Sequence, residues 1–364
     1  MRTKFLILIL YSAKMKTKHL KKEIVMKKIL TVALAMVMLC SVMLAGCKKE
    51  EEKKAEGGMK IATSTGDFDG YAKTLEAKID LLHQSGFRYI DLSFYGREDN
   101  AKFLADDWKE YTQSVKKLAE EKDMEFVQAH AMGGNVWKSE KVYDEVVTAT
   151  KRAIEVCAEL GIPNIVVHAP YTSKVTSKEE FYERTLAYYQ EYFPLMEQTG
   201  VNVLVENSFY SELKVEHYFY SGEELAAFLD YANHPQLKAC WDTGHANIQG
   251  TDQHRDIVAL GDRLAAVHIA DNLGEHDDHL MPYQGTVNMD AVMTGLLKIG
   301  YTGAFTFEAA NTLNYGTGSA YPRNSYNKSQ KTFAPSVELK VEAEKLLLSV
   351  GKHILTKYEI QIAE

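Results

Sequence analysis

Four polar side chains close four successive apolar runs in the second half of this 364-residue chain. Glu206, Asp242 and Glu308 supply carboxylates, and His268 supplies an imidazole. A carboxylate that emerges from an apolar strand is costly to bury unless a positive charge compensates it. We therefore expect these four side chains to share one site that binds a divalent metal ion.

The alternative for any one of these positions is a structural ion pair. It does not explain the set, because the run ends at 203–207, 240–245, 267–271 and 305–308 contain no Lys or Arg. One divalent cation with three carboxylates and a neutral imidazole leaves a net charge of about −1. The mostly oxygen ligation favours Mn²⁺ or Mg²⁺, and the imidazole keeps Co²⁺ and Zn²⁺ as alternatives.

Such a site needs a scaffold that brings four strand ends together. Apolar, β-rich runs recur at intervals of about 30 residues, the size of one strand–helix unit. Some, such as Ile165–Val167, are apolar without alternation, which is typical of strands buried on both faces. The expected strands are 60–65, 89–94, 125–131, 164–168, 201–206, 238–242, 265–270 and 304–308.

Helical patterns with capping signals fill the intervals between these runs. Eight strands alternating with eight helices predict an α/β fold, a closed (β/α)8 TIM barrel with the site at its C-terminal mouth. A doubly wound open sheet is the alternative, but no Gly-rich dinucleotide turn follows the first strand. The expected helices include 71–84, 141–160, one from Ser177 to Gly200, one that opens at Ser221, 290–299 and 337–349.

The chain resembles the xylose isomerase-like TIM barrels, which include sugar isomerases and epimerases, inosose dehydratases and apurinic-site endonucleases. The resemblance covers nearly all of residues 59–364 and implies that Glu206, Asp242, His268 and Glu308 hold a catalytic metal ion. There are two departures from the family pattern. Its glycine-rich turn is here 282–285, and 271–284 contains no Arg, although ketose 3-epimerases commonly place one there. The motifs that carry the resemblance are Val205–Asn207, Trp241–His245, Val267–Asn272 and Asp277–Gly285.

The resemblance also implies roles in catalysis. Isomerising or epimerising a sugar requires removal of a proton beside a carbonyl, and a metal ion stabilises the resulting enediolate. We expect Glu206 and Glu308 to remove and return that proton. His245 is expected to contact a substrate oxygen, with a contact that orients Asp242 as the alternative.

Further polar residues are expected around this centre. His130 and His168 end two earlier runs, and we expect both to bind substrate. Asp277 and His279 are candidates for an additional metal ion. Aromatic and amide residues in the loops 209–220 and 311–334 are expected either to cover a carbohydrate or to pack as ordinary barrel loops.

The sequence thus predicts a metal-dependent isomerase or epimerase of a non-phosphorylated sugar, keto-sugar or cyclitol. A keto-sugar dehydratase or lyase would use the same chemistry. A metal phosphodiesterase similar to apurinic-site endonucleases would use three metal ions. A sugar-binding lipoprotein would bind the sugar without transferring a proton. The formal net charge of −8 and the absence of an evident basic strip argue against a nucleic-acid partner.

The N-terminal region is expected to direct export rather than to fold. The apolar run 29–43 after Met26 resembles a signal peptide and ends in Leu44–Cys47, which resembles a bacterial lipobox. We interpret 1–47 as signal peptide and lipobox, 1–25 as an extension from a misassigned start codon, 48–58 as a flexible tether and 59–364 as the catalytic domain. Lipidation of Cys47 would anchor an extracytoplasmic protein to a bacterial membrane, where Cys157 and Cys240 are expected as buried free thiols. Assembly into a homo-oligomer is compatible with the sequence.

Overall fold

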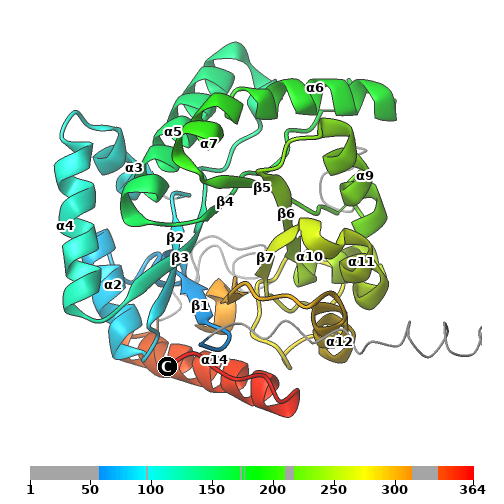
Figure 1. The fold of residues 1–364 in the computed structure, drawn as a ribbon. Helices are drawn as coiled ribbons and strands as arrows, with labels where there is room; N and C mark the ends of the chain where they lie inside the picture. The colour runs from blue at the N-terminus through cyan, green and yellow to red at the C-terminus, as the bar shows by residue number, and fades with distance from the viewer. Residues whose placement is uncertain (1–56, 96, 173, 176, 210–216, 314–334) are drawn as a thin grey trace, which may run out of the picture. The chain divides into compact units, whose positions relative to one another are not determined.

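Eight parallel strands form the centre of the molecule, and helices surround them (Figure 1). The computed structural model describes residues 57–95, 97–172, 174–175, 177–209, 217–313 and 335–364. Neighbouring strands follow the order β7-β6-β5-β4-β3-β2-β1-β8, and a bridge between Ile269 and Phe307 joins β7 to β8. The predicted TIM barrel is confirmed. Its strands are β1 Ile61–Ser64, β2 Tyr89–Ser93, β3 Glu125–His130, β4 Asn164–Val166, β5 Asn202–Glu206, β6 Leu237–Asp242, β7 Leu264–His268 and β8 Phe305–Phe307.

The helices cover the outside of the barrel, and several intervals hold two of them. The single helix predicted from Ser177 to Gly200 is wrong, because Pro194 lies in the first turn of α7 and cannot donate a backbone hydrogen bond to α6. Within the described ranges, no helix is long and apolar enough to span a membrane. The helices are α2 Leu75–Gln84, α3 Arg97–Leu104, α4 Trp108–Glu121, α5 Glu140–Leu160, α6 Lys178–Gln190, α7 Phe193–Thr199, α9 Gly222–Ala232, α10 Thr243–Gln249, α11 Gln253–Leu260, α12 Met289–Ile299 and α14 Val337–Lys357.

Side-chain alternation along the strands separates two apolar regions. A large cluster lies between the strands and the helices, and it includes Val205 and Trp241. A small second cluster of Val166, Leu204, Cys240 and Ala266 comes from the opposite face of the strands and fills the barrel interior. Glu206 and Asp242 lie two residues beyond members of the interior cluster, so their side chains share that inner face. Cys157 and Cys240 are buried free thiols, as predicted.

A buried ion pair fixes the N-terminal part of α14 against the barrel. Lys340 Nζ lies 2.6 Å from Glu344 Oε1, and neither side chain is exposed to solvent. The same ammonium group donates to the carbonyl oxygen of Ala310, which follows β8, at 3.0 Å. Burial, and then the charge of Glu344, raise the pKa of nearby Asp67 well above its usual range, and the charge of Lys340 opposes this rise. Lys340 therefore compensates more than one buried acidic group.

We expect Lys340→Met to lower the free energy of unfolding by about 3–5 kcal/mol, because it leaves Glu344 buried without a cation. Urea denaturation measures the difference. Lys345→Met is the matched control on the same helix, because the pair of Lys345 with Glu342 is 48% and 66% exposed. Its loss is expected to cost less than about 1 kcal/mol. Equal effects of the two substitutions would contradict this account of α14.

Candidate active site

The ends of β5, β6, β7 and β8 bring the four predicted ligands together. Glu206, Asp242 and His268 are the last residues of their strands, and Glu308 directly follows β8. One ligand atom from each of the four lies within 4.8 Å of the others. Three carboxylates and one imidazole at this spacing match the donor set of a divalent metal ion.

The contacts within this group leave ligand atoms available. His268 Nδ1 lies 2.5 Å from Glu206 Oε1 and 3.1 Å from Glu308 Oε2. Asp242 caps α10, where its Oδ1 accepts a hydrogen bond of 2.6 Å from the backbone N–H of His245. The other carboxylate oxygen of Asp242 is buried and, within the described ranges, has no hydrogen-bond partner. A buried carboxylate oxygen without a partner, beside two further carboxylates, fits a metal-binding position.

The pKa values of the acidic groups depend on burial and on the charges of their neighbours. Burial raises the pKa of Asp242 to about 7, against a lowering by His245, and the charges of Glu206 and Glu308 raise it further. Burial also opposes ionisation of Glu206, but His268 and His168 together hold its pKa well below the usual range. The carboxylates thus rely on positive charge supplied by the site itself.

A second group of possible ligands shares Glu206. His130 ends β3 and His168 lies two residues beyond β4. The two Nε2 atoms are 3.0 Å apart, and His168 Nε2 lies 2.8 Å from Glu206 Oε2. Burial, and then the neighbouring His168, lower the pKa of His130 to about 4, so its ring is neutral. The two histidines predicted to bind substrate therefore lie directly beside the candidate metal ligands.

A third group, of His245, Asp277 and His279, lies next to Asp242, whose Oδ1 is 3.9 Å from His245 Nδ1. Asp277 Oδ2 is 2.9 Å from His279 Nε2 and 3.4 Å from His245 Nε2. His245 Nδ1 lies 2.9 Å from the backbone oxygen of Asn207, and His279 Nδ1 lies 3.0 Å from that of Glu308. These contacts connect the loop of Asp277 and His279 to the ends of β5 and β8.

Two residues that position the site, Asn207 and Asp271, were not predicted from the sequence. Asn207 accepts a 2.6 Å hydrogen bond from the Asp242 N–H and donates one of 2.9 Å to its carbonyl oxygen. Asp271 accepts from the backbone N–H groups of Gly285 and Val287 at 2.8 Å and 3.0 Å. A Cβ at Gly285 would lie 2.2 Å from the carbonyl oxygen of Asn272, so only glycine fits this close approach. Asn207 directly follows the predicted ligand Glu206, and Asp271 lies three residues after the predicted ligand His268. These positions within the sequence motifs could have identified both residues.

A cavity of about 310 Å³ opens beside the candidate ligands. Its described wall combines aromatic rings, amides, hydroxyl groups, imidazoles and two carboxylates, and none of the described lining residues is Lys or Arg. Among them, Tyr95, Asn135, Tyr171 and His217 were not identified from the sequence. The lining residues are Tyr95, Gly134, Asn135, His168, Ala169, Tyr171, Glu206, Asn207, Ser208, Phe209, His217, His245 and Asp277.

The loop residues were expected either to cover a carbohydrate or to pack as ordinary barrel loops, and the structure shows one example of each. Phe209 lines the cavity. Phe219 is fully buried, and its ring centroid lies 5.1 Å from that of Phe181, so it packs into the protein core. Residues 210–216 and 314–334 lie outside the described residues, as do 1–56 with Cys47, so the corresponding predictions remain predictions.

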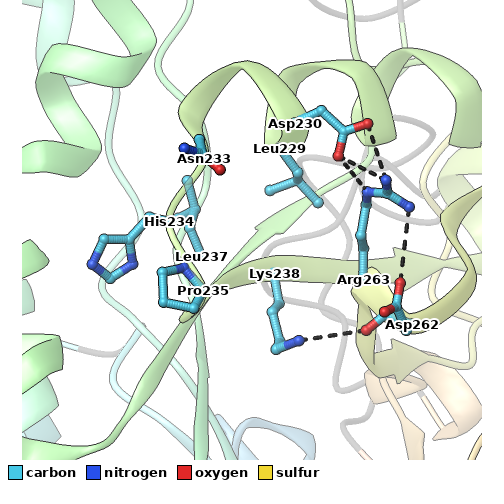
Figure 2. Close-up of a pocket in the computed structure, with 9 residues that line it drawn as sticks. All are labelled: Leu229, Asp230, Asn233, His234, Pro235, Leu237, Lys238, Asp262 and Arg263. Carbon is cyan, nitrogen blue, oxygen red and sulfur yellow. Dashed lines mark hydrogen bonds and ion pairs between the residues drawn. The ribbon is translucent and has the colours of Figure 1, made fainter.

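A second, larger cavity of about 530 Å³ lies at the opposite end of the strands (Figure 2). Its lining residues precede or begin β6 and β7, whereas the candidate ligands end them. Arg263 is paired with Asp230 at 2.7 Å, and Lys238 Nζ donates to the carbonyl oxygen of Asp262 at 3.4 Å. Its charged groups already have partners, and the N-terminal face of a TIM barrel serves stability rather than catalysis.

Comparison with known proteins gives consistent results. The profile of the xylose isomerase-like TIM barrel family matches residues 79–331. An inosose isomerase of Bacillus velezensis is 22% identical over 243 residues, which is 64% of this chain and 82% of that protein. An L-ribulose 3-epimerase of Methylomonas is 37% identical over 91 residues, but these cover only 24% of this chain and 29% of that enzyme.

The same architecture occurs in solved structures. A structure of IOLI protein with a zinc atom bound superimposes with a TM-score of 0.64 at 17% identity, covering 82% of this chain and 99% of the other. A D-psicose 3-epimerase gives a TM-score of 0.62 at 17% identity and the same coverage. At this level of identity, the likeness establishes the fold.

Proposed function

The chain belongs to the xylose isomerase-like TIM barrel family, and we propose that it is a divalent-metal-dependent isomerase or epimerase of a non-phosphorylated sugar, keto-sugar or cyclitol. The observation that carries this proposal is the convergence of Glu206, Asp242, His268 and Glu308, whose ligand atoms lie within 4.8 Å of one another. Because Glu206 also lines the adjacent cavity, a substrate held there would contact one of the proposed catalytic carboxylates.

The proposed reaction uses two carboxylates of this chain. One of Glu206 and Glu308 removes the proton beside the substrate carbonyl, and the other delivers a proton to the product. His268 lies between them, with Nδ1 2.5 Å from Glu206 and 3.1 Å from Glu308. His245 and His168, both in the cavity wall, would hold substrate oxygens. A bound divalent cation would neutralise the carboxylates and stabilise the negative charge of the enediolate.

The cavity supports an uncharged polyol as substrate. Aromatic faces such as Tyr95 and Tyr171 suit the C–H face of a sugar, while Asn135, Asn207 and Ser208 suit hydroxyl groups. A phosphorylated sugar would meet Glu206 and Asp277 without a Lys or Arg among the described lining residues. The oxygen-rich ligand set favours Mn²⁺ or Mg²⁺, and the zinc in the IOLI structure keeps Zn²⁺ as an alternative, with Co²⁺.

A second candidate is a metal phosphodiesterase similar to the apurinic-site endonucleases. The observation in its favour is that two further groups adjoin the first. His130–His168–Glu206 shares Glu206 with it, and His245–Asp277–His279 contacts it through His245 and Asp242. Together they would provide ligands for three metal ions. The net charge of −8 and the absence of Lys and Arg from the described part of the cavity wall make the isomerase the better-supported proposal.

Metal content separates these proposals. The purified chain, without residues preceding Cys47, is expected to bind about one Mn²⁺ or Co²⁺ ion, measured by elemental analysis after dialysis. With that ion it is expected to convert one member of a panel of unphosphorylated ketoses, aldoses and inososes. About three zinc ions per chain and cleavage of abasic DNA would instead support the phosphodiesterase. A dehydratase would give a product of lower mass from the same panel.

We also propose that the protein is lipid-anchored outside the cytoplasm. The lipobox at Leu44–Cys47 supports this proposal. Mass spectrometry of the protein from a bacterial membrane would identify a mature N-terminus at a lipidated Cys47. Association into a homo-oligomer likewise remains a prediction, for which sedimentation analysis is the direct test.

A further inference from the structure

Asp91 is an acidic residue inside the barrel that the proposed reaction does not use. It lies in β2, and its register partner in β3 is Gln128, which also faces the interior. Its side chain is buried, with 1% of its surface exposed, and none of the described residues forms a hydrogen bond with its Oδ1. In the part of the chain that the structure describes, its ion-pair partner is His268, whose Nε2 lies 3.9 Å from Asp91 Oδ2.

The two nitrogens of His268 therefore face different acidic groups. Nδ1 points to Glu206 and Glu308, which are candidate metal ligands. Nε2 is buried, faces Asp91 and has no hydrogen-bond partner among the residues that the structure describes. The ring of His130 stacks on His268 at 5.6 Å with an interplanar angle of 13°. This stacking restricts the imidazole plane, and the contacts of Nδ1 with Glu206 and Glu308 set which edge of the ring faces Asp91.

We propose that Asp91 is a positioning residue for metal binding, which keeps the hydrogen of His268 on Nε2 and leaves the Nδ1 lone pair for the metal ion. This inference rests on the proposed metal-dependent function. A histidine ligand needs one nitrogen without hydrogen, and a carboxylate beside the other nitrogen selects that tautomer.

The observed distance defines how Asp91 acts. At 3.9 Å the two atoms are beyond hydrogen-bonding distance, so an ionised Asp91 acts on the ring through its charge. Burial raises the pKa of Asp91 to about 7, against a lowering by the charge of His268, and a divalent cation bound beside His268 would lower it further. Burial strengthens the effect of the Asp91 charge on the ring, because Asp91 and His268 are both shielded from water. Cys240 also lies near His268, but burial raises the pKa of its thiol to about 12, so it carries no charge, and a thiol is a weak acceptor.

Asp91→Asn tests the inference with little change in side-chain volume. Its affinity for Mn²⁺ and Co²⁺, measured by competition with a chromogenic chelator, is expected to be about 10–100-fold weaker than that of the unsubstituted chain. Asp256→Asn is the matched control. Asp256 is a buried aspartate in α11 and belongs to none of the candidate ligand groups, so its substitution is expected to leave metal affinity within about twofold.

A second measurement does not depend on folding of the variant. Proton–nitrogen correlation spectra of the unsubstituted chain loaded with Zn²⁺ report the tautomer of His268, and we expect the hydrogen on Nε2. A hydrogen on Nδ1, or equal metal affinity of Asp91→Asn and the unsubstituted chain, would overturn the inference and leave the metal site intact. If the unsubstituted chain binds no divalent metal, the proposed function fails, and the inference fails with it.

Discussion

Glu308→Gln is expected to lower kcat for the productive sugar by about 10²–10⁴-fold, the usual contribution of a positioned general acid or base. Gln has nearly the size of Glu and retains one oxygen ligand, but it cannot accept and return a proton. At saturating metal, substrate affinity is therefore expected to change little. Steady-state kinetics and calorimetric sugar binding, both with excess metal, separate these two effects.

Glu342→Gln is the control for this substitution. Glu342 lies in α14, is 66% exposed and pairs only with Lys345 among the described contacts, so kcat is expected to stay unchanged. A Glu308→Gln variant with full activity would remove Glu308 from the mechanism. If the unsubstituted chain were inert on the whole panel and both forms bound sugar equally, the sugar-binding alternative would replace the enzyme proposal.

Asp242→Ala is expected to reduce bound metal from about one ion per chain to none at micromolar concentration. The substitution removes a fully buried ligand between Glu206 and His268. It also removes the cap of α10, which contributes about 1 kcal/mol of stability. Elemental analysis and urea denaturation of the metal-free protein measure the two effects separately.

Asp242→Asn distinguishes the ligand from the cap. An Asn side chain can still accept the 2.6 Å hydrogen bond from the His245 N–H, but it carries no charge. We expect this variant to lose most metal affinity and to keep the stability of the metal-free protein. Full metal binding by either Asp242 variant would mean that the ion sits elsewhere, most directly at His130, His168 and Glu206.

Much of the fold could be read from the sequence because parallel barrels repeat one local pattern. Apolar runs such as Ile165–Val167 indicate strands buried on both faces, and each of the eight predicted strands overlaps an observed one. The helix boundaries were less accurate, because a new helix, α7, begins around Pro194 and α10 starts at Thr243, directly after the ligand Asp242.

The candidate site was predictable in composition because its residues end strands. All parallel strands of a barrel open onto one mouth, so Glu206, Asp242, His268 and Glu308 had to lie near one another. The cavity wall was not predictable to the same degree. Tyr95, Asn135 and Tyr171 lie in loops whose paths depend on contacts between distant segments, such as the hydrogen bond from the Tyr171 N–H to Asn135 at 3.4 Å.

The sequence by itself determined the number of strands, their parallel order and the residues at their ends, because these depend on local hydrophobic pattern and spacing. Only the tertiary structure decided which side chains face each other. Asp242 lies opposite His268 because the β6–β7 register shifts after Ala239, and Asp91 lies opposite Gln128 because the β2–β3 register shifts after Ile90. A shift of one residue changes every later partner along a pair of strands, and it arises from closure of the whole barrel rather than from any single segment.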